Sequence, residues 1–223
     1  MVAQRLSVIV PALNEARGIR AALEALAPLR ARGHEVIVAD GGSTDGTAQL
    51  ALELCDQLVN AARGRAVQMN AAARVATGDA LLFLHADTRL PPGAAEMIRA
   101  SLQTYLWGRF DVEIDGRHPL LKVVGGAMNL RSRLSGIATG DQAIFVRRGA
   151  FPGFAEIALM EDVAFCKRMK RLGPPACLRE KVRTSGRRWE SRGVLRTIVL
   201  MWRLRLLYAL GARPERLARL YYE

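Results

Sequence analysis

With 223 residues and a mass of 24.5 kDa, the chain fits one domain, or one domain with a small appendage, because single cores grow to about 250 residues. Half of its residues are hydrophobic, so it can build a full core and is not expected to be disordered. The net charge of +12 comes mainly from arginine, which suits recognition of phosphates and carboxylates but is equally well explained by a biased genome composition.

The first half of the chain alternates between short apolar runs and segments with helical periodicity. The apolar runs predict strands at 5–13, 34–40, 57–61 and 79–87, and the periodic segments predict helices at 15–33, 45–55, 64–78 and 91–105. This alternation predicts parallel βαβ units with helices on both faces of a sheet. The unbroken apolar character of the strands fits burial on both sides.

Past position 105 the pattern changes. We predict strands at 108–115 and 141–148, and helices at 118–136 and 161–173. The chain is therefore expected to consist of an N-terminal α/β half and a mixed C-terminal half that share one sheet.

The tail at 193–222 reads as one or two apolar helices that carry several arginines. Arg196 and Arg203 share a helical face, whereas Arg205 points to the opposite side, so the amphipathic pattern is imperfect. Two interpretations stay open. The tail packs on the sheet or on a partner subunit of a homo-oligomer, or it docks on anionic lipid.

Cysteine usage and the lack of targeting signals indicate a cytoplasmic protein. Cys55, Cys166 and Cys177 share no close spacing, so neither a zinc site nor a disulfide framework is expected. We see no signal peptide and no apolar run close to the ~20 residues that span a bilayer. A peripheral position at the inner face of the membrane fits these features as well.

Two carboxylates end predicted strands of the first half, Asp40 after 34–39 and Asp87 after 79–86. Ligands of open parallel sheets bind beyond the carboxyl ends of the strands. Two like charges there repel each other unless a cation or a hydrogen-bonding ligand lies between them. The sequence has no G-x-x-x-x-G-K-[ST] loop and no G-x-G-x-x-G turn after the first strand, so a nucleotide would be held by side chains and a metal.

Four segments occur in an order that resembles a known family. SVIVPALNEA, VIVADGGSTDGT, HADT and MEDVAF together are similar to family-2 glycosyltransferases of the GT-A fold, over roughly residues 5–190. GIATGDQAIFVRR and TSGRRWESRG also resemble a compact bacterial subgroup called rSAM/selenodomain-associated transferases.

The resemblance implies a nucleotide-diphospho-sugar transferase fold, with a mostly parallel central sheet flanked by helices. It divides the chain into a glycosyltransferase domain at 1–190 and a helical tail at 191–223. Within the domain, a nucleotide-binding half at about 1–105 precedes an acceptor half at about 106–190.

The resemblance implies a donor site in the first half. Asp40 matches the aspartate that accepts a hydrogen bond from the uracil of a nucleotide sugar, and a carboxylate, which only accepts, can read that N–H. Pro11 and Glu15 lie on the loop that lines the nucleotide pocket, and Arg65 matches an arginine near the nucleotide. The glycines at 41–42 would let the nucleotide approach the backbone.

These residues also have plain structural interpretations. A residue within 43–45 would cap the next helix, although capping does not explain Asp40. Glu15 would be an acid in a first helical turn, and Arg65 a solvated arginine at a helix start.

The family's metal motif is D-x-D, and His85-Ala86-Asp87 stands in its place without the first acid. The resemblance assigns Asp87 to a divalent cation, Mg²⁺ or Mn²⁺, that bridges the diphosphate. One carboxylate suffices, because Mg²⁺ takes its other ligands from phosphates and water. A histidine such as His85 at a strand end is more commonly structural, and Asp87 would alternatively cap the helix that begins near 91–93.

The resemblance places the catalytic base in the second half. Asp162 matches the aspartate that removes the proton of the acceptor hydroxyl in inverting enzymes, and Glu161 is its neighbour. Acidic residues in a first helical turn are also ordinary. Asp141, at the start of the strand predicted at 141–148, matches a position that contacts the donor or the acceptor.

The segment GRRWESRG is similar to an element near the acceptor channel. Arg187 or Arg188 would grip the leaving diphosphate with two hydrogen bonds, and Trp189 would stack on a sugar. The plain interpretation is a basic surface loop with a partly buried tryptophan.

The function implied is inverting transfer of a sugar from a nucleoside diphosphate sugar, expected to be a UDP-sugar, to a hydroxyl acceptor with help from a divalent metal. One alternative is a sugar-phosphate nucleotidyltransferase, which would carry a glycine-rich, lysine-bearing loop where PALNEA stands. Another is a non-catalytic protein that binds RNA or anionic lipid, although no nucleic-acid motif supports RNA. Docking of the tail on lipid would point to a lipid-linked acceptor.

Overall fold

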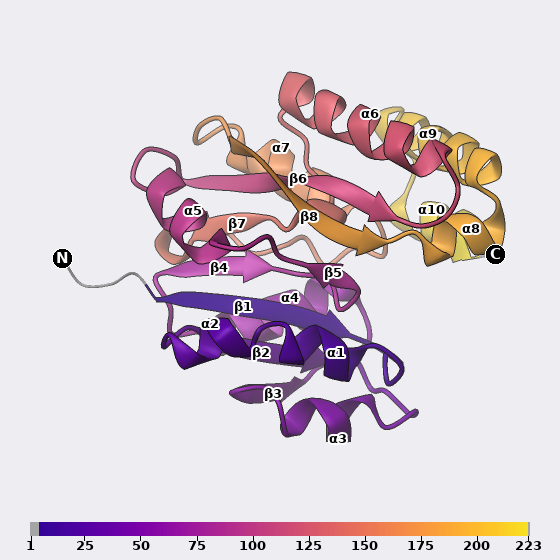
Figure 1. Ribbon diagram of the computed structural model, residues 1–223. Coiled ribbons are helices and arrows are strands. Elements are labelled where there is room, and N and C mark those ends of the chain that lie inside the picture. Colours follow the sequence, from indigo (N-terminus) through magenta and orange to yellow (C-terminus); the bar gives the residue numbers. More distant parts are fainter. Residues whose placement is uncertain (1–4, 223) are drawn as a thin grey trace.

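The computed structural model describes residues 5–222, which form one mixed sheet between layers of helices (Figure 1). The strands are β1 (Leu6–Ala12), β2 (Glu35–Asp40), β3 (Gln57–Asn60), β4 (Ala80–Phe83), β5 (Thr88–Arg89), β6 (Trp107–Asp115), β7 (Phe145–Arg147) and β8 (Ala176–Ser185). The helices are α1 (Ile19–Glu24), α2 (Ala27–Ala31), α3 (Thr47–Leu52), α4 (Arg65–Val75), α5 (Ala94–Ser101), α6 (Leu120–Ser135), α7 (Glu161–Met169), α8 (Arg187–Arg192), α9 (Val194–Ala209) and α10 (Pro214–Tyr222). Short 3₁₀ turns lie at Gly140–Gln142 and Arg148–Ala150.

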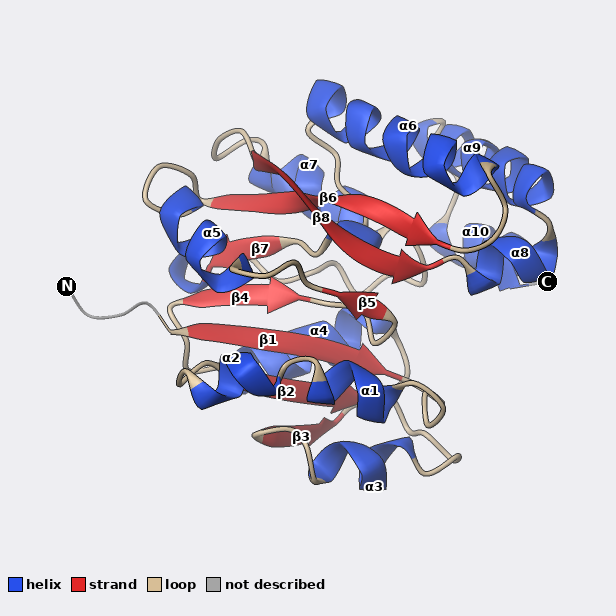
Figure 2. Cartoon of the chain, viewed as in Figure 1, coloured by secondary structure: helices blue, strands red, loops and turns tan. Residues whose placement is uncertain are grey.

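The strands follow the order β3-β2-β1-β4-β7-β6-β8-β5 across the sheet (Figure 2). β3, β2, β1 and β4 are parallel, and β7 runs antiparallel to both β4 and β6. β8 is parallel to β6, and β5 is antiparallel to β8. The predicted α/β class is confirmed: a parallel N-terminal half and a mixed C-terminal half share one sheet.

Helices cover both faces of the sheet around β1, β2 and β4, which explains why these strands are almost entirely apolar. On β1, Val8 and Val10 face a core built with α1, α3 and α5, whereas Ile9 faces a second core built with α4 and α7. Successive side chains of a strand point to opposite faces, so a strand covered on both sides needs apolar residues at every position.

Several predicted elements have different boundaries in the structure. The strand predicted at 79–87 ends at Phe83, so Asp87 lies in a turn beyond β4 and not at a strand end. The single helix predicted at 15–33 is wrong, because the chain forms α1 and α2 instead. Pro28 lies in the first turn of α2, where its missing N–H is harmless, but a proline cannot continue a preceding helix. The strand predicted at 141–148 is wrong in its first half. Ala143 has a φ of 45°, which interrupts an extended chain, and only Phe145–Arg147 forms a strand.

β8 was not predicted from the sequence. Its central residues are charged and exposed, and Ala176 and Val182 are among its few buried side chains. The pairing of β6 with β8 shifts between Phe110 and Asp111, because Arg179 and Glu180 of β8 bulge out without partners on β6. The bulge removes the strict alternation by which a half-buried strand is recognised.

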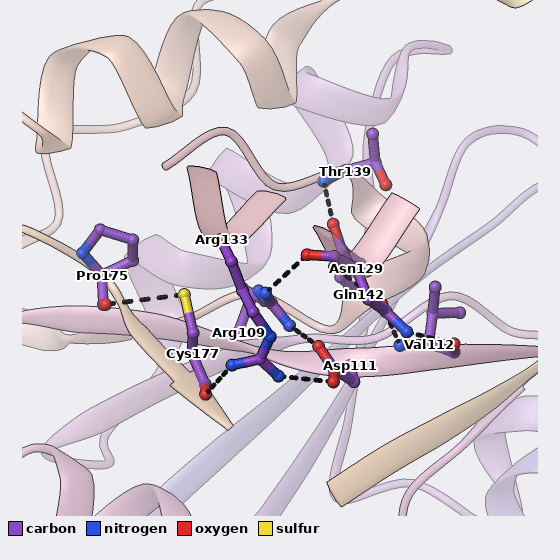
Figure 3. Close-up of polar contacts among 9 residues, drawn as sticks. All are labelled: Arg109, Asp111, Val112, Asn129, Arg133, Thr139, Gln142, Pro175 and Cys177. Carbon is purple, nitrogen blue, oxygen red and sulfur yellow. Dashed lines mark hydrogen bonds and ion pairs between the residues drawn. The ribbon is translucent and has the colours of Figure 1, made fainter. Parts of the chain in front are cut away.

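A buried polar network fixes α6 against β6 (Figure 3). Arg109 is fully buried and forms an ion pair with Asp111, whose second oxygen accepts a hydrogen bond from Arg133 of α6 at 2.5 Å. Asn129 of α6 accepts from the N–H of Val112 at 2.8 Å and donates to its carbonyl at 2.9 Å. β7 pairs with β6 only at 107–108, so α6 replaces the missing strand partner further along β6.

The C-terminal helices α9 and α10 pack on the start of α7. Leu204 of α9 and Leu217 of α10 are fully buried against Leu159, Met160 and Val163. This agrees with the packing interpretation of the tail, while the boundary between the domain at 1–190 and the tail at 191–223 stays a prediction. Across 5–222, every helix is either too short or too polar to cross a membrane.

Candidate active site

Asp40 lies at the carboxyl edge of the parallel strands, where β1 and β2 end together. The register pairs Ala12 with Asp40 and Pro11 with Ala39, so Pro11 and Asp40 stand on the same rim, as predicted. Oδ2 of Asp40 accepts the backbone N–H groups of Gly42 and Ser43, each at 2.9 Å. Oδ1 is buried and has no hydrogen-bond partner among residues 5–222. A buried acceptor without a partner costs about 1–3 kcal/mol, so a donor from a bound ligand or a water would stabilise this oxygen.

Side-chain hydrogen bonds connect the two loops at this rim, which are residues 13–18 after β1 and residues 41–46 after β2. Ser43 Oγ accepts the N–H of Asn14 at 2.9 Å, and Asn14 Oδ1 accepts the N–H of Thr44 at 2.9 Å. Asp45 accepts the N–H groups of Ala16 at 3.0 Å and of Thr47, the first residue of α3, at 3.1 Å. Within 43–45, the predicted contact with the helix start thus comes from Asp45, and the other two residues hold the loops together.

Gln68 of α4, which the sequence did not single out, clamps the ends of β1 and β2. Its Nε2 donates to the carbonyls of Ala12 at 2.7 Å and Ala39 at 2.8 Å. A Cβ on Gly41 would lie 2.9 Å from Gln68 Cδ, so Gly41 makes room for this clamp rather than for a nucleotide. Gly42 is exposed, with a φ of +86° and open space around it, and stays compatible with the approach of a ligand.

Glu15, Asp87 and Arg187 gather at the same edge of the sheet. Burial and the neighbouring charge of Asp87 raise the pKa of Glu15 above its ordinary value. Arg187 Nη2 lies 3.9 Å from Glu15 Oε2. Asp87 is exposed, and α5 begins at Gly93 without a side-chain cap, so the capping interpretation of Asp87 is wrong.

The residues present fit a divalent cation only when a ligand completes its coordination. No group of three or more metal-ligating side chains occurs within 5–222. Asp87 is an accessible hard ligand, and its repulsion of Glu15 would be relieved by a cation. The remaining ligands would have to be phosphate oxygens and waters.

His85, which replaces the first acid of D-x-D, is tied to Asp141. Its Nδ1 lies 3.2 Å from Asp141 Oδ1. Burial would raise the pKa of Asp141, but the hydrogen bond and charge of His85, together with the charge of Arg65, hold this pKa below its ordinary value. Asp141 stands in the 3₁₀ turn Gly140–Gln142 and not on a strand. His85 therefore anchors this turn to the end of β4.

The opposite side of the same turn is anchored by Asp162. Its Oδ2 accepts the N–H of Gly140 at 3.1 Å, and its Oδ1 accepts the N–H of Val163 at 2.7 Å. Gly140 is packed so closely that a Cβ there would overlap the ring of His85. The start of α7, the turn and the end of β4 thus bring Asp162, Asp141 and His85 together. Both oxygens of Asp162 keep a free lone pair, so the carboxylate can still accept a proton.

Glu161 and Arg65 form an ion pair between the two halves of the chain. Arg65 Nη1 lies 3.2 Å from Glu161 Oε1, and Glu161 is 3% exposed. Burial and the charge of Asp162 raise the pKa of Glu161 against the opposing effect of Arg65. The charges of Glu161 and Asp162 outweigh burial and raise the pKa of Arg65. Arg65 is the first residue of α4, as predicted, but it forms an ion pair with Glu161 and is not simply solvated.

The remaining predicted residues lie on α8. Arg188 donates to the hydroxyl of Tyr221 in α10 and lies over its ring, 5.5 Å from the centroid. Trp189 is half-buried and packs on the apolar cluster of Ile114, Leu121 and Val194. These placements favour structural roles for both, and contact with diphosphate or sugar stays a prediction.

Two further arginines lie near the candidate base. Burial and the charge of Arg205 lower the pKa of Arg131 to about 10, and Nε and Nη2 of Arg131 have no partner within the described chain. Burial also lowers the pKa of Arg205, against the attraction of Asp162 and Asp141. Arg205, which does not fit the amphipathic pattern of the tail, is therefore half-buried, and it is attracted by the charges of Asp162 and Asp141.

Comparison with known proteins identifies the family. The family model of Glycosyl transferase family 2 matches residues 7–123. A PGL/p-HBAD biosynthesis glycosyltransferase of Mycobacterium bovis is 31% identical over 162 residues, which cover 68% of this chain and 62% of the relative. The chain belongs to glycosyltransferase family 2. It spans less than two thirds of the length of these curated relatives.

Solved structures share the predicted GT-A fold. TarS residues 1–349 from S. aureus gives a TM-score of 0.66 at 21% identity, over 82% of this chain and 60% of that one. Glucosyl-3-phosphoglycerate synthase from Mycobacterium tuberculosis, solved with Mn²⁺, UDP and phosphoglyceric acid, gives 0.59 at 22% identity, over 80% and 68%. TarS has also been solved with UDP-GlcNAc.

Gly140→Ala should destabilise the protein by about 1–3 kcal/mol, because the added methyl overlaps the His85 ring in a packed turn. Urea unfolding measures this loss. Gly149→Ala is the matched control, since nothing lies within 4 Å of a Cβ there, and it should change stability by less than about 0.5 kcal/mol. Equal stability of the two variants would show that the turn does not press on His85.

Proposed function

We propose that this glycosyltransferase transfers a sugar from a UDP-sugar to a hydroxyl acceptor with inversion, assisted by a divalent metal. The observation that carries the proposal is the unpartnered Oδ1 of Asp40, a buried acceptor at the carboxyl rim of the parallel strands. Family membership favours glycosyl over nucleotidyl transfer, and two proteins of the same fold were solved with UDP or a UDP-sugar.

The UDP-sugar donor would bind across the carboxyl edge of β1 and β2, the rim that carries Pro11 and Asp40. Asp40 Oδ1 accepts the ring N–H of uracil, a group that an acceptor-only carboxylate can select. Pro11 and Glu15 line the nucleotide side, and the two fastened loops hold them in place before binding. Arg65, paired with Glu161, keeps the first turn of α4 beside the nucleotide.

Asp87 would hold Mg²⁺ or Mn²⁺ together with diphosphate oxygens. When bound, the metal would neutralise part of the charge that develops on the leaving diphosphate. Arg187 stands beside Glu15 at the same edge and is 68% exposed, so it is free to turn toward a phosphate. Arg188 would need to leave Tyr221 to do the same.

Asp162 would act as the base on the acceptor. In a single displacement the acceptor oxygen attacks the sugar carbon from the face opposite the diphosphate, which inverts the configuration. Asp162 accepts the hydroxyl proton as the new bond forms. Glu161 supports this step through its ion pair with Arg65, and Asp141 faces the acceptor from the anchored turn.

We also infer a cytoplasmic protein of the rSAM/selenodomain-associated subgroup, at the inner face of the membrane, with a lipid-linked acceptor. Cys55, Cys166 and Cys177 are free thiols, which fits a reducing compartment.

Asp40→Ala should weaken UDP binding about 10–100-fold with or without metal, because a charge-assisted hydrogen bond is lost. Asp87→Ala should abolish only the metal-dependent part of UDP binding. Titration calorimetry with UDP, with and without Mn²⁺, separates these effects. Glu53→Ala, which removes an exposed carboxylate on the outer surface, is the control and should bind as the parent does. If both site variants bind UDP like the parent, the donor site is misassigned.

Asp162→Asn keeps the shape of the side chain but removes the basic oxygen. It should lower kcat for sugar transfer about 100-fold or more and leave the affinity for UDP nearly unchanged. Glu161→Gln should cost less, since Glu161 only supports the base. Transfer by Asp162→Asn at near the parent rate would reject this base and leave Glu161 or Asp141 as candidates.

A further inference from the structure

Helix α9 exposes a continuous apolar stripe to solvent. Leu195, Val199, Trp202, Leu206 and Leu210 follow one another at spacings of three or four residues, which places them on one side of a helix. Their exposed fractions are 67%, 67%, 76%, 61% and 74%. Leu204, on the other side of the same helix, is fully buried. α9 therefore has two apolar faces, and only one of them is used within the described chain.

Helix α6 lies beside α9 (Figure 1) and also carries exposed apolar side chains. Val123, Leu130 and Leu134 of α6 are 64%, 60% and 81% exposed. Elsewhere between residues 5 and 222, exposed large apolar side chains are scattered, as at Leu52 and Leu172. Scattered residues are normal, but a concentration on neighbouring helices marks an interaction surface. We call this surface, formed by the five residues of α9 and these three of α6, the α6–α9 face.

The charges around this face are mostly positive. Arg196 and Arg203 are exposed and adjoin the stripe on the same side of α9, and neither α9 nor α6 contains an acidic residue. From 187 to 222 the chain carries nine arginines and two glutamates. An apolar stripe bordered by arginines is the pattern of helices that lie in a lipid headgroup region.

A hollow adjoins the face at the start of α9. It has a volume of about 590 Å³, and its charged lining residues are Arg117, Arg196 and Glu190, whose Oε1 accepts the backbone N–H groups of Arg117 and His118; Leu195 also lines it. Leu195 and Arg196 therefore border both the hollow and the stripe. Two arginines beside an apolar stripe suit a phosphate-bearing headgroup whose acyl chains lie along the stripe.

We propose that the α6–α9 face docks on an anionic lipid bilayer. A second copy of this chain is a poorer occupant, because a two-fold contact through the same face would bring the arginines of both copies together without acids to neutralise them. An anionic membrane supplies the opposite charge and an apolar layer at once. That the membrane presents the acceptor rests on the proposed function, whereas docking itself does not.

The test uses the whole protein with vesicles of phosphatidylcholine, alone or mixed with phosphatidylglycerol. We expect sedimentation with the mixed vesicles at low salt, weaker binding at high salt, and little binding to neutral vesicles. The emission of Trp202 should shift to the blue on binding, because this exposed indole enters the headgroup region. Equal binding to neutral and anionic vesicles, or to neither, would overturn the proposal.

Variants locate the contact. Leu206→Asp should weaken vesicle binding about tenfold or more, because a charge replaces a side chain that enters the apolar layer. Arg196→Gln and Arg203→Gln should each weaken binding to anionic vesicles about fivefold. Leu52→Asp is the matched control, since Leu52 is 64% exposed on α3, at the far end of the molecule from α9 (Figure 1), and it should bind like the parent. Similar losses for Leu206→Asp and Leu52→Asp would overturn the assigned face.

Two further measurements separate this inference from its rivals. Sedimentation equilibrium should show a monomer in solution, and a dimer that Leu206→Asp dissociates would instead assign the face to a second copy. Titration calorimetry with UDP measures the affinity of the donor site independently of vesicle binding. Lost vesicle preference with normal UDP binding would reject the docking alone, whereas vesicle binding without any UDP binding would reject the proposed function alone.

Discussion

A buried ion pair joins the two halves of this protein, and the geometry of the candidate site depends on it. Glu161 is 3% exposed, and a carboxylate so deeply buried is costly unless an opposite charge compensates it. Arg65, at the first residue of α4, supplies that charge from the N-terminal half. Asp162 follows Glu161 directly. The ion pair therefore also sets where the candidate base stands relative to Asp40 and the rim.

The substitution in the metal motif has a structural consequence. His85 stands where similar enzymes carry an acid, and it holds Asp141 at 3.2 Å, while Asp162 holds Gly140 in the same turn from the other side. A histidine at this position thus connects the end of β4 to the turn Gly140–Gln142 of the C-terminal half. Asp87 is left as an exposed carboxylate at this edge, with Glu15 as its acidic neighbour.

The parallel half could be predicted from sequence because its strands are buried on both faces and its helices are periodic. Asp40 and Asp87 followed from strand ends and the family resemblance. β8 could not be predicted, since its charged residues sit at exposed positions and a bulge breaks its alternation. Gln68 and Gly140 were missed because their roles arise only from contacts between residues distant in sequence. Likewise, the sequence showed that Arg205 leaves the amphipathic pattern, but not that it turns toward Asp162.

The central claim is that Asp40 accepts a hydrogen bond from uracil, while Asp87 binds the metal that contacts the diphosphate. A crystal structure of the protein with UDP and Mn²⁺ tests it most directly, because the metal can be located by its anomalous scattering. The account predicts Asp40 Oδ1 within hydrogen-bond distance, about 2.7–3.2 Å, of the uracil ring nitrogen, and Mn²⁺ bound to a carboxylate oxygen of Asp87. Uracil bound elsewhere with Asp40 Oδ1 still unpartnered, or Mn²⁺ bound away from Asp87, would contradict it.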